Sequence, residues 1–268
     1  MADESSYKFI HKLRGKRVLI FGGTSGIGYA VAAACVEHGC TVIISGSNEP
    51  NLTSTVLRLK TSYPHIASSS SSSSQVIITH VCDLSKKEDL ESNIQALLSA
   101  ATRGAKEKLD HVVFTAGDAR SLQSIAEVTV AQFEKNQVVR NIAPIIVAKY
   151  LRQYLDVSPD SSYTLTGGFI ATKPPPGWGL HAASGLEGLT RGLAVDMAPV
   201  RINLVAPGAI KTEAMKGVPE QALDSLAQAT TIKRLGRPED IAEAYLYLMK
   251  DGYITGSILH SNGGRFLL

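Results

Sequence analysis

The sequence predicts an α/β fold in which one parallel sheet is covered by helices on both faces. Two observations carry this prediction: short apolar runs alternate with amphipathic stretches along 268 residues, and a glycine-rich turn follows the first run directly. Strands that alternate with helices form parallel sheets, and right-handed crossovers then place helices on both faces. We expect a single doubly wound domain over residues 1–268, with a polar N-terminal extension at 1–14 and a serine-rich surface loop at 66–75.

Each strand is predicted from a short apolar run, and each helix from apolar residues at helical spacing. A seven-stranded sheet follows. The predicted strands are Arg17–Phe21, Thr41–Ser45, Gln75–Val81, Asp110–Thr115, Ser162–Thr166, Arg201–Val205 and Ser257–His260. The predicted helices are Gly26–His38, Asn51–Thr61, Lys86–Ala101, Val130–Leu155, His181–Ala198, Pro219–Thr230 and Pro238–Lys250.

Composition excludes several classes of protein. A net charge of +3 without a Lys/Arg cluster argues against a nucleic-acid-binding protein. The N-terminus lacks the apolar core of a signal peptide, and no run is long enough to cross a bilayer. Cys35, Cys40 and Cys82 lie among apolar neighbours, so we expect reduced, buried thiols in a cytoplasmic protein with no metal site. A Cys35–Cys40 pair or metal site is the alternative to plain core packing.

The clearest functional signal is the segment 18–28, in which a buried strand runs into Gly22, Gly23, Gly26 and Gly28. Glycines allow a tight turn and a close approach of the backbone to a pyrophosphate. The helix that follows offers free N–H groups and a partial positive charge to that anion. The segment therefore predicts a dinucleotide site.

The spacing of Gly22, Gly26 and Gly28 resembles the short-chain dehydrogenase/reductase family, and matching segments extend over nearly the whole chain. They are Asp83-Leu84, Thr115-Ala116-Gly117, Ala206-Pro207-Gly208 followed by Ile210 and Thr212, Leu235–Asp240, and Gly263-Gly264. The resemblance implies a Rossmann domain, a nicotinamide cofactor, a small-molecule substrate and a homodimer or homotetramer. The cofactor-binding residues inferred on these grounds are Gly22, Thr24, Ser25, Gly26, Ile27, Gly28, Ser45, Ser47, Asn48, Asp83, Leu84, Ala116, Gly117, Pro207, Gly208, Ile210 and Thr212.

NADP(H) is favoured over NAD(H) by the residues at the end of the second predicted strand. An NAD site usually has an acid there, about 20 residues beyond the glycine turn, to bind the ribose 2′-OH. Positions 45–48 hold Ser45, Gly46, Ser47 and Asn48 instead. No carboxylate in this segment repels a 2′-phosphate, and the serine hydroxyls could donate to one.

The catalytic residues of the resembled family are missing. In that family a Tyr and a Lys, four residues apart on one helix face, protonate the developing alkoxide. The register of residues 187–191 places Gly179 and Ala183 at those two positions. The family's Ser falls in the segment 166–168, where only Thr166 has a hydroxyl, and its helical Asn falls at Arg140, with Asn141 one residue away.

We therefore expect unusual catalysis, with Arg140, Trp178 and Thr166 as the candidate catalytic residues. Arg140 could hold a carboxylate, amide oxygen or phosphate, and Trp178 could form a flat pocket wall. Ordinary salt bridging and packing are the alternatives. His181, Lys173 and Tyr163 are weaker candidates because of their spacing, and residues 211–228 are expected to form a lid.

The combination of Arg140, the proline-rich turn 173–177 and Trp178 is similar to fungal alkaloid-pathway members of the family. Some of these reduce an iminium and then promote an intramolecular Diels–Alder cyclisation. This chain has Pro174–Pro176 where such a member would carry an acid. The resemblance implies an NADP(H)-dependent oxidoreductase of secondary metabolism that acts on a preactivated small molecule. The alternatives are a non-redox cyclase or isomerase that retains the nucleotide, and a catalytically silent nucleotide-binding protein.

Overall fold

Seven parallel strands form the central sheet, which confirms the predicted fold class. The computed structural model describes residues 8–64, 77–118, 125–182 and 185–268, with the backbone alone at 181 and 182. The strand order is β3-β2-β1-β4-β5-β6-β7, so the direction of winding reverses between β1 and β4. The strands are β1 (Arg17–Phe21), β2 (Thr41–Gly46), β3 (Ile77–Val81), β4 (His111–Phe114), β5 (Ser162–Thr166), β6 (Arg201–Pro207) and β7 (Ile258–Ser261).

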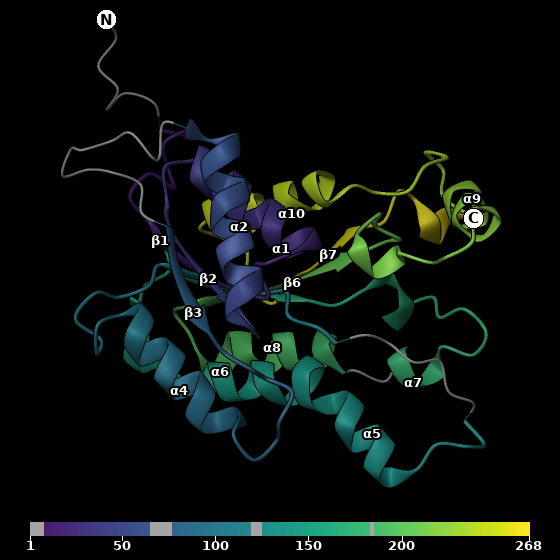
Figure 1. The fold of residues 1–268 in the computed structure, drawn as a ribbon, viewed down its shortest axis with the longest axis horizontal. Helices are drawn as coiled ribbons and strands as arrows, with labels where there is room; N and C mark the ends of the chain where they lie inside the picture. The colour runs from purple at the N-terminus through teal and green to yellow at the C-terminus, as the bar shows by residue number, and fades with distance from the viewer. Residues whose placement is uncertain (1–7, 65–76, 119–124, 183–184) are drawn as a thin grey trace, which may run out of the picture.

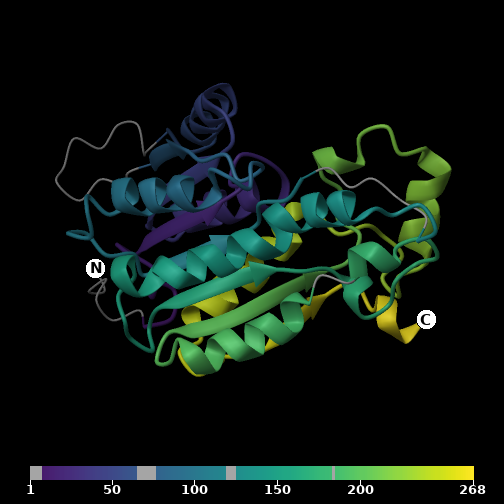
Figure 2. The ribbon, with the colours of Figure 1, turned by 90° about the horizontal axis from the view of Figure 1, so that it is seen from below.

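Helices cover both faces of the sheet (Figure 1). One face carries α1 (Gly26–Glu37), α2 (Glu49–Ser62) and α10 (Pro238–Lys250). The other carries α4 (Leu90–Ala101), α6 (Ala143–Tyr154) and α8 (Leu186–Asp196), which lie in front of the strands in Figure 2. The remaining helices, α5 (Val130–Gln137), α7 (Gly179–Ala182) and α9 (Glu220–Gln228), lie toward the carboxyl ends of the strands.

The strands are apolar throughout because side chains on both of their faces are buried. On β1, Leu19 and Phe21 pack in the layer with α4 and α6, whereas Val18 and Ile20 pack in the layer with α1 and α10. Each face of the sheet therefore packs against its own hydrophobic core.

The helix predicted at Val130–Leu155 contains a π-helical turn, η2 (Val138–Ile142), between α5 and α6. Pro144 has no N–H to donate to the carbonyl of Arg140, which is the α-helical partner four residues back. The Ala143 N–H instead reaches back five residues to the Val138 carbonyl. Such turns re-aim side chains and are common at functional sites.

Two other predicted helices are shorter than expected. The Asp83 side chain accepts hydrogen bonds from the Ser85 N–H and hydroxyl, which turns the chain, and α4 begins only at Leu90. The stretch predicted as one helix at His181–Ala198 holds the end of α7 and the whole of α8. Gly185 lies just before α8 with φ +62°, a conformation that ends a helix.

The predicted N-terminal extension at 1–14 is partly described. In the N-terminal extension, Leu13 is buried against the α1 and α10 layer, and its carbonyl accepts a hydrogen bond from the Cys40 thiol. All three cysteines are buried and unpaired, as predicted. The serine-rich segment 66–75 lies outside the described residues. Among the helices that the structure describes, none has the length and apolarity needed to cross a membrane.

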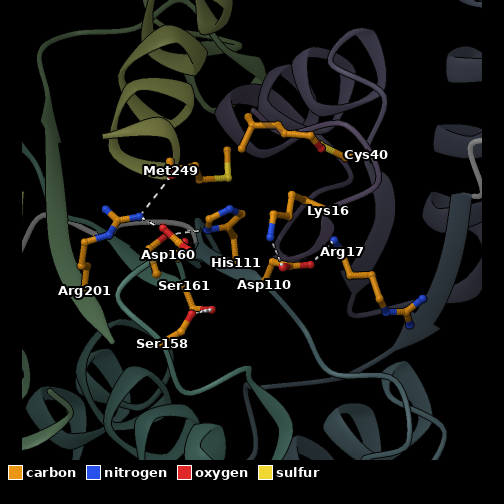
Figure 3. A network of polar contacts seen from close by, with 12 residues as sticks. Lys16, Arg17, Cys40, Asp110, His111, Ser158, Asp160, Ser161, Arg201 and Met249 are labelled. Carbon is orange, nitrogen blue, oxygen red and sulfur yellow. Dashed lines mark hydrogen bonds and ion pairs between the residues drawn. The ribbon is translucent and has the colours of Figure 1, made fainter. Parts of the chain in front are cut away.

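A polar network lies at the amino ends of the strands (Figure 3). Asp110 accepts hydrogen bonds from the Lys16 ammonium (2.7 Å) and the Arg17 N–H (2.8 Å). His111 contacts the Ser162 hydroxyl through Nδ1 at 2.9 Å and is 1% exposed. Burial, together with the charges of Arg201 and Lys16, lowers the pKa of His111 from 6.5 to about 3.

Acid should therefore destabilise the fold through His111. Below pH 6.5 the unfolded chain binds a proton at this ring that the folded chain excludes until about pH 3. The contribution of His111 is complete above pH 6.5, and about 2 kcal/mol of unfolding free energy is lost between pH 7 and pH 5. Urea unfolding of wild type and His111→Gln at both pH values measures this loss. The variant should show a flatter pH dependence, and parallel pH profiles would contradict the assignment.

Candidate active site

The glycine-rich turn between β1 and α1 is closely packed. Gly22 has φ +79°, and the N–H groups of Gly22 and Gly23 both donate to the Ser45 carbonyl. A Cβ on Gly28 would overlap the Gly22 carbonyl and lie 2.5 Å from the Thr115 hydroxyl. No side chain larger than hydrogen fits there, so the start of α1 lies directly against the turn. This backbone cradle fits a pyrophosphate.

The N-terminus of α1 holds a carboxylate from a distant loop. Ser25 is the N-cap residue but makes no side-chain cap. The Gly26 N–H donates instead to the Glu213 carboxylate at 3.0 Å. Glu213 begins the short helix η4 (Glu213–Met215) in the segment expected to act as a lid. The Glu213 carboxylate therefore accepts a hydrogen bond from a backbone N–H that the family resemblance assigns to a phosphate of the cofactor.

The residues predicted for the adenosine half of the cofactor divide into exposed and buried groups. Ser47 is exposed, and Asn48 is exposed while its side chain caps α2 by accepting from the Asn51 N–H. Asp83 is half-buried, and hydrogen bonds from Ser85 hold its pKa below the usual range. Ser45 is 1% exposed and lies beside the Cys82 thiol. Its hydroxyl is buried because β2 extends through it to Gly46, and its role at a 2′-phosphate stays a prediction.

The other predicted cofactor residues lie at the carboxyl edge of the sheet. Pro207 and Ile210 are buried, whereas Thr24, Ile27, Gly208 and Thr212 are half-buried. The methyl group of Thr212 would be 3.2 Å from a Cβ on Gly26, so the loop after β6 lies directly on the glycine turn. Leu84 is 6% exposed beneath Asp83. The fold thus brings residues from β1, β2, β3, β4 and β6 to one edge.

The turn after β4 joins the glycine turn to η2. The Thr115 hydroxyl donates to the Phe21 carbonyl at 2.8 Å, and a Cβ on Gly22 would lie 2.6 Å from the Ala116 Cα. Gly117 follows, and the Arg140 guanidinium lies against it, 2.9 Å from the position of a Cβ. Arg140 donates from Nε to the Asp118 carboxylate at 2.9 Å and from Nη2 to the Asp118 carbonyl.

A pocket of about 50 Å³, partly open to solvent, lies beside these residues at the carboxyl ends of β4 and β5. Arg140 and Asn141 of the π-helical turn both line it, and so do Asn136 and Gln137 at the end of α5. The residues that line it are Phe114, Ala116, Asn136, Gln137, Arg140, Asn141, Thr166, Gly167, Gly168, Ile170, Ala171, Leu180 and Leu186. None of these described residues is a Tyr or a Lys.

Thr166 lines this pocket, but its hydroxyl points to other partners. It donates to the Phe114 carbonyl at 2.6 Å and lies 2.5 Å from the Tyr245 hydroxyl on α10. Tyr245 is fully buried, and burial raises its pKa. The hydroxyl of Thr166 therefore ties β5 to β4 and α10, and it would have to leave these partners to contact a ligand.

The weaker candidates for proton transfer are engaged elsewhere. Tyr163 is fully buried, burial raises its pKa, and its hydroxyl donates to the Pro144 carbonyl at 3.2 Å. Lys173 donates to the carbonyls of Arg265 and Leu268.

Trp178, the third candidate catalytic residue, is half-buried at the end of the proline turn and does not line the pocket as the structure describes it. Gly179 begins α7, whereas Ala183 and the side chain of His181 lie outside the described parts.

The sequence prediction missed Asp118 and Glu213. Asp118 directly follows the predicted turn Thr115-Ala116-Gly117, so the motif could have placed it at the carboxyl edge of the sheet. No sequence pattern pointed to Glu213, because its contact partner Gly26 lies 187 residues away along the chain.

Known proteins resemble the chain over nearly its whole length. An SDR-like Rossmann domain model matches residues 9–268. The short-chain dehydrogenase/reductase malC of Malbranchea aurantiaca is 44% identical over 264 residues, which cover 95% of this chain and 96% of that protein. The short-chain dehydrogenase/reductase fsr5 of Gibberella fujikuroi is 37% identical over 268 residues, with 97% and 98% covered.

Solved structures agree with these relatives. The structure of the MalC reductase/Diels–Alderase from Malbranchea aurantiaca matches with a TM-score of 0.89 and 43% identity, covering 97% of this chain and 99% of that one. A short-chain dehydrogenase from Burkholderia cenocepacia J2315 in complex with NADP matches with a TM-score of 0.80 and 25% identity, covering 95% and 99%. A fold of this kind implies a nicotinamide cofactor, and the glycine cradle fits one. The chain belongs to the short-chain dehydrogenase/reductase family.

Proposed function

We propose that this protein is an NADP(H)-dependent oxidoreductase that reduces a preactivated small molecule, such as an iminium, without a tyrosine proton donor. The observation that carries the proposal is the pairing of a closely packed glycine turn with a pocket whose described lining contains neither Tyr nor Lys. The exposed Ser47 and Asn48 at the end of β2, without a carboxylate at 45–48, favour NADP(H) over NAD(H).

The chemistry of the substrate decides whether a proton donor is needed. When bound, a reduced nicotinamide supplies a hydride. Hydride addition to a neutral ketone leaves an alkoxide, and general acid catalysis of its protonation is worth about 10²–10⁴-fold. Hydride addition to an iminium carbon moves the C=N electron pair onto nitrogen and leaves a neutral amine, which needs no proton. The residues of this pocket then have only to position the substrate and exclude water.

The experiment compares two substrates of the same shape. The purified protein is mixed with NADPH and either a cyclic N-methyl iminium salt or the cyclic ketone of the same ring size, and the nicotinamide absorbance is followed. We expect the iminium to be reduced at least about 100-fold faster than the ketone. The ketone needs an acid to protonate its alkoxide, whereas the iminium needs no proton. Equal rates, or a preference for the ketone, would refute the proposal. NADH in place of NADPH tests the cofactor preference.

A second candidate is a cyclase that keeps the nucleotide without redox change. The solved relative is named a reductase/Diels–Alderase, which supports cyclisation as a candidate activity beside reduction. A cyclase would form a product from a diene–dienophile substrate while the nicotinamide absorbance stays constant, whereas a coupled reductase and cyclase would consume one NADPH for each cyclised product. The stoichiometry of NADPH to product separates the two.

A further inference from the structure

The charge of the pocket depends on one ion pair. Arg140 is the charged residue among the described residues that line the pocket. Its guanidinium is paired with the Asp118 carboxylate at 2.9 Å, and the two side chains are 27% and 37% exposed. A half-buried pair is only partly screened by solvent, so removal of one partner leaves the charge of the other acting on the pocket.

Two contacts with Asp118 hold the Arg140 guanidinium in place at the pocket. Two of the three guanidinium nitrogens, Nε and Nη2, donate to Asp118. The third, Nη1, lies 2.9 Å from where a Cβ on Gly117 would be. Among the described residues, the N–H groups of Nη1 and the second N–H of Nη2 have no hydrogen-bond partner, so a ligand that contacts Arg140 would meet a guanidinium already paired with Asp118. The glycine at 117 leaves room for this arrangement.

We propose that Asp118 sets the charge of the substrate that the pocket accepts. Acting through Arg140, it neutralises the guanidinium and holds it against Gly117, so that a cationic ligand meets a neutral pair instead of a like charge. Asp118 is thus a positioning residue. The proposal rests on the proposed function, since it names the cationic class of substrate as the one favoured at the same site.

The test uses two ligands of the same shape and different charge. N-benzylpyridinium is a stable cation with its charge delocalised in a ring, and diphenylmethane is its uncharged isostere. Binding of each is measured by calorimetry in the presence of saturating NADP⁺, for wild type and for Asp118→Asn. We expect Asp118→Asn to weaken N-benzylpyridinium at least about 10-fold, because the guanidinium is no longer neutralised, and to change diphenylmethane less than about 2-fold.

Three further variants separate charge from structure. Asp118→Glu keeps the carboxylate and should restore most of the affinity for the cation. Gly117→Ala keeps both charges but displaces the guanidinium, and should reduce the preference for the cation. Glu91→Gln removes an exposed carboxylate paired with Lys149, remote from the pocket, and should change neither ligand. If Asp118→Asn weakens both ligands equally, or neither, the inference is refuted.

The inference and the proposed function fail in different ways. NADP⁺ binding and iminium reduction are measured on the same preparations. A protein that prefers the cation in an Asp118-dependent manner but oxidises no NADPH with iminium salts supports the charge inference and refutes the reductase. If the wild type and the Asp118→Asn variant reduce iminium salts equally well, the proposed function is retained and the inference is refuted.

Discussion

Replacing Arg201 with methionine should destabilise the fold by at least about 1–3 kcal/mol, which is the range for leaving a buried polar group without its partner. Arg201 is 3% exposed and donates to five carbonyl oxygens, of Pro159, Asp160, Leu248, Met249 and Ile254. Two of these, Leu248 and Met249, are in the last turn of α10, where carbonyls lack helical partners. Methionine has a similar length but no donor, so the carbonyls would remain unsatisfied in the interior.

Urea unfolding of Arg201→Met and of a matched control, Arg152→Met, measures the effect. Arg152 is exposed and donates to the carbonyls of Asp196 and Ala198 at 3.0 and 3.1 Å. Its loss should cost less than about 1 kcal/mol, because water replaces its hydrogen bonds. A cavity of about 270 Å³ adjoins Arg201 at the network shown in Figure 3. If water entered from it and satisfied the carbonyls, both variants would lose equally little stability, contrary to this expectation.

Replacing Gly28 with alanine should reduce NADPH affinity by about 10- to 100-fold, which corresponds to about 1–3 kcal/mol of overpacking at the turn predicted to bind the pyrophosphate. The new Cβ would overlap the Gly22 carbonyl and contact the Thr115 hydroxyl, so the glycine turn and the β4 turn would have to separate. Both turns carry backbone groups predicted to contact the cofactor. Overpacking of this kind also costs about 1–3 kcal/mol of stability.

Gly192→Ala provides the control, because Gly192 is an exposed helical glycine with no neighbour within 4 Å of an added Cβ. This substitution should leave NADPH binding unchanged and raise stability by about 0.5–1 kcal/mol. Fluorescence titration with NADPH and a thermal melt on each variant give both quantities. Wild-type affinity in Gly28→Ala would mean that the cofactor does not use this turn.

The strands were predictable because burial on both faces leaves a continuous apolar signature. Arg17–Phe21 and Ser162–Thr166 were predicted with their observed bounds. The helices were less well predicted where a local hydrogen bond competes with the helix, as at Asp83 and Ser85, or where a backbone donor is missing, as at Pro144. The missing N–H of Pro144 was visible in the sequence, but the π-helical turn that it favours leaves the apolar periodicity almost unchanged.

The site was predictable where glycines mark the backbone and not where side chains meet across the fold. The close packing at Gly22 and Gly28 follows from the motif. The burial of the Ser45 hydroxyl and the engagement of the Thr166 hydroxyl by Tyr245 depend on neighbours supplied by other strands and helices. Periodicity reports whether a residue is buried, but it does not report which distant group the residue faces.

The contact between Glu213 and the Gly26 amide has a consequence for cofactor binding. One N–H cannot serve a carboxylate and a pyrophosphate together, and the two anions repel one another. If a pyrophosphate takes the Gly26 amide, as the glycine motif predicts, Glu213 has to give up this hydrogen bond, and the short helix η4 loses one of its links to α1.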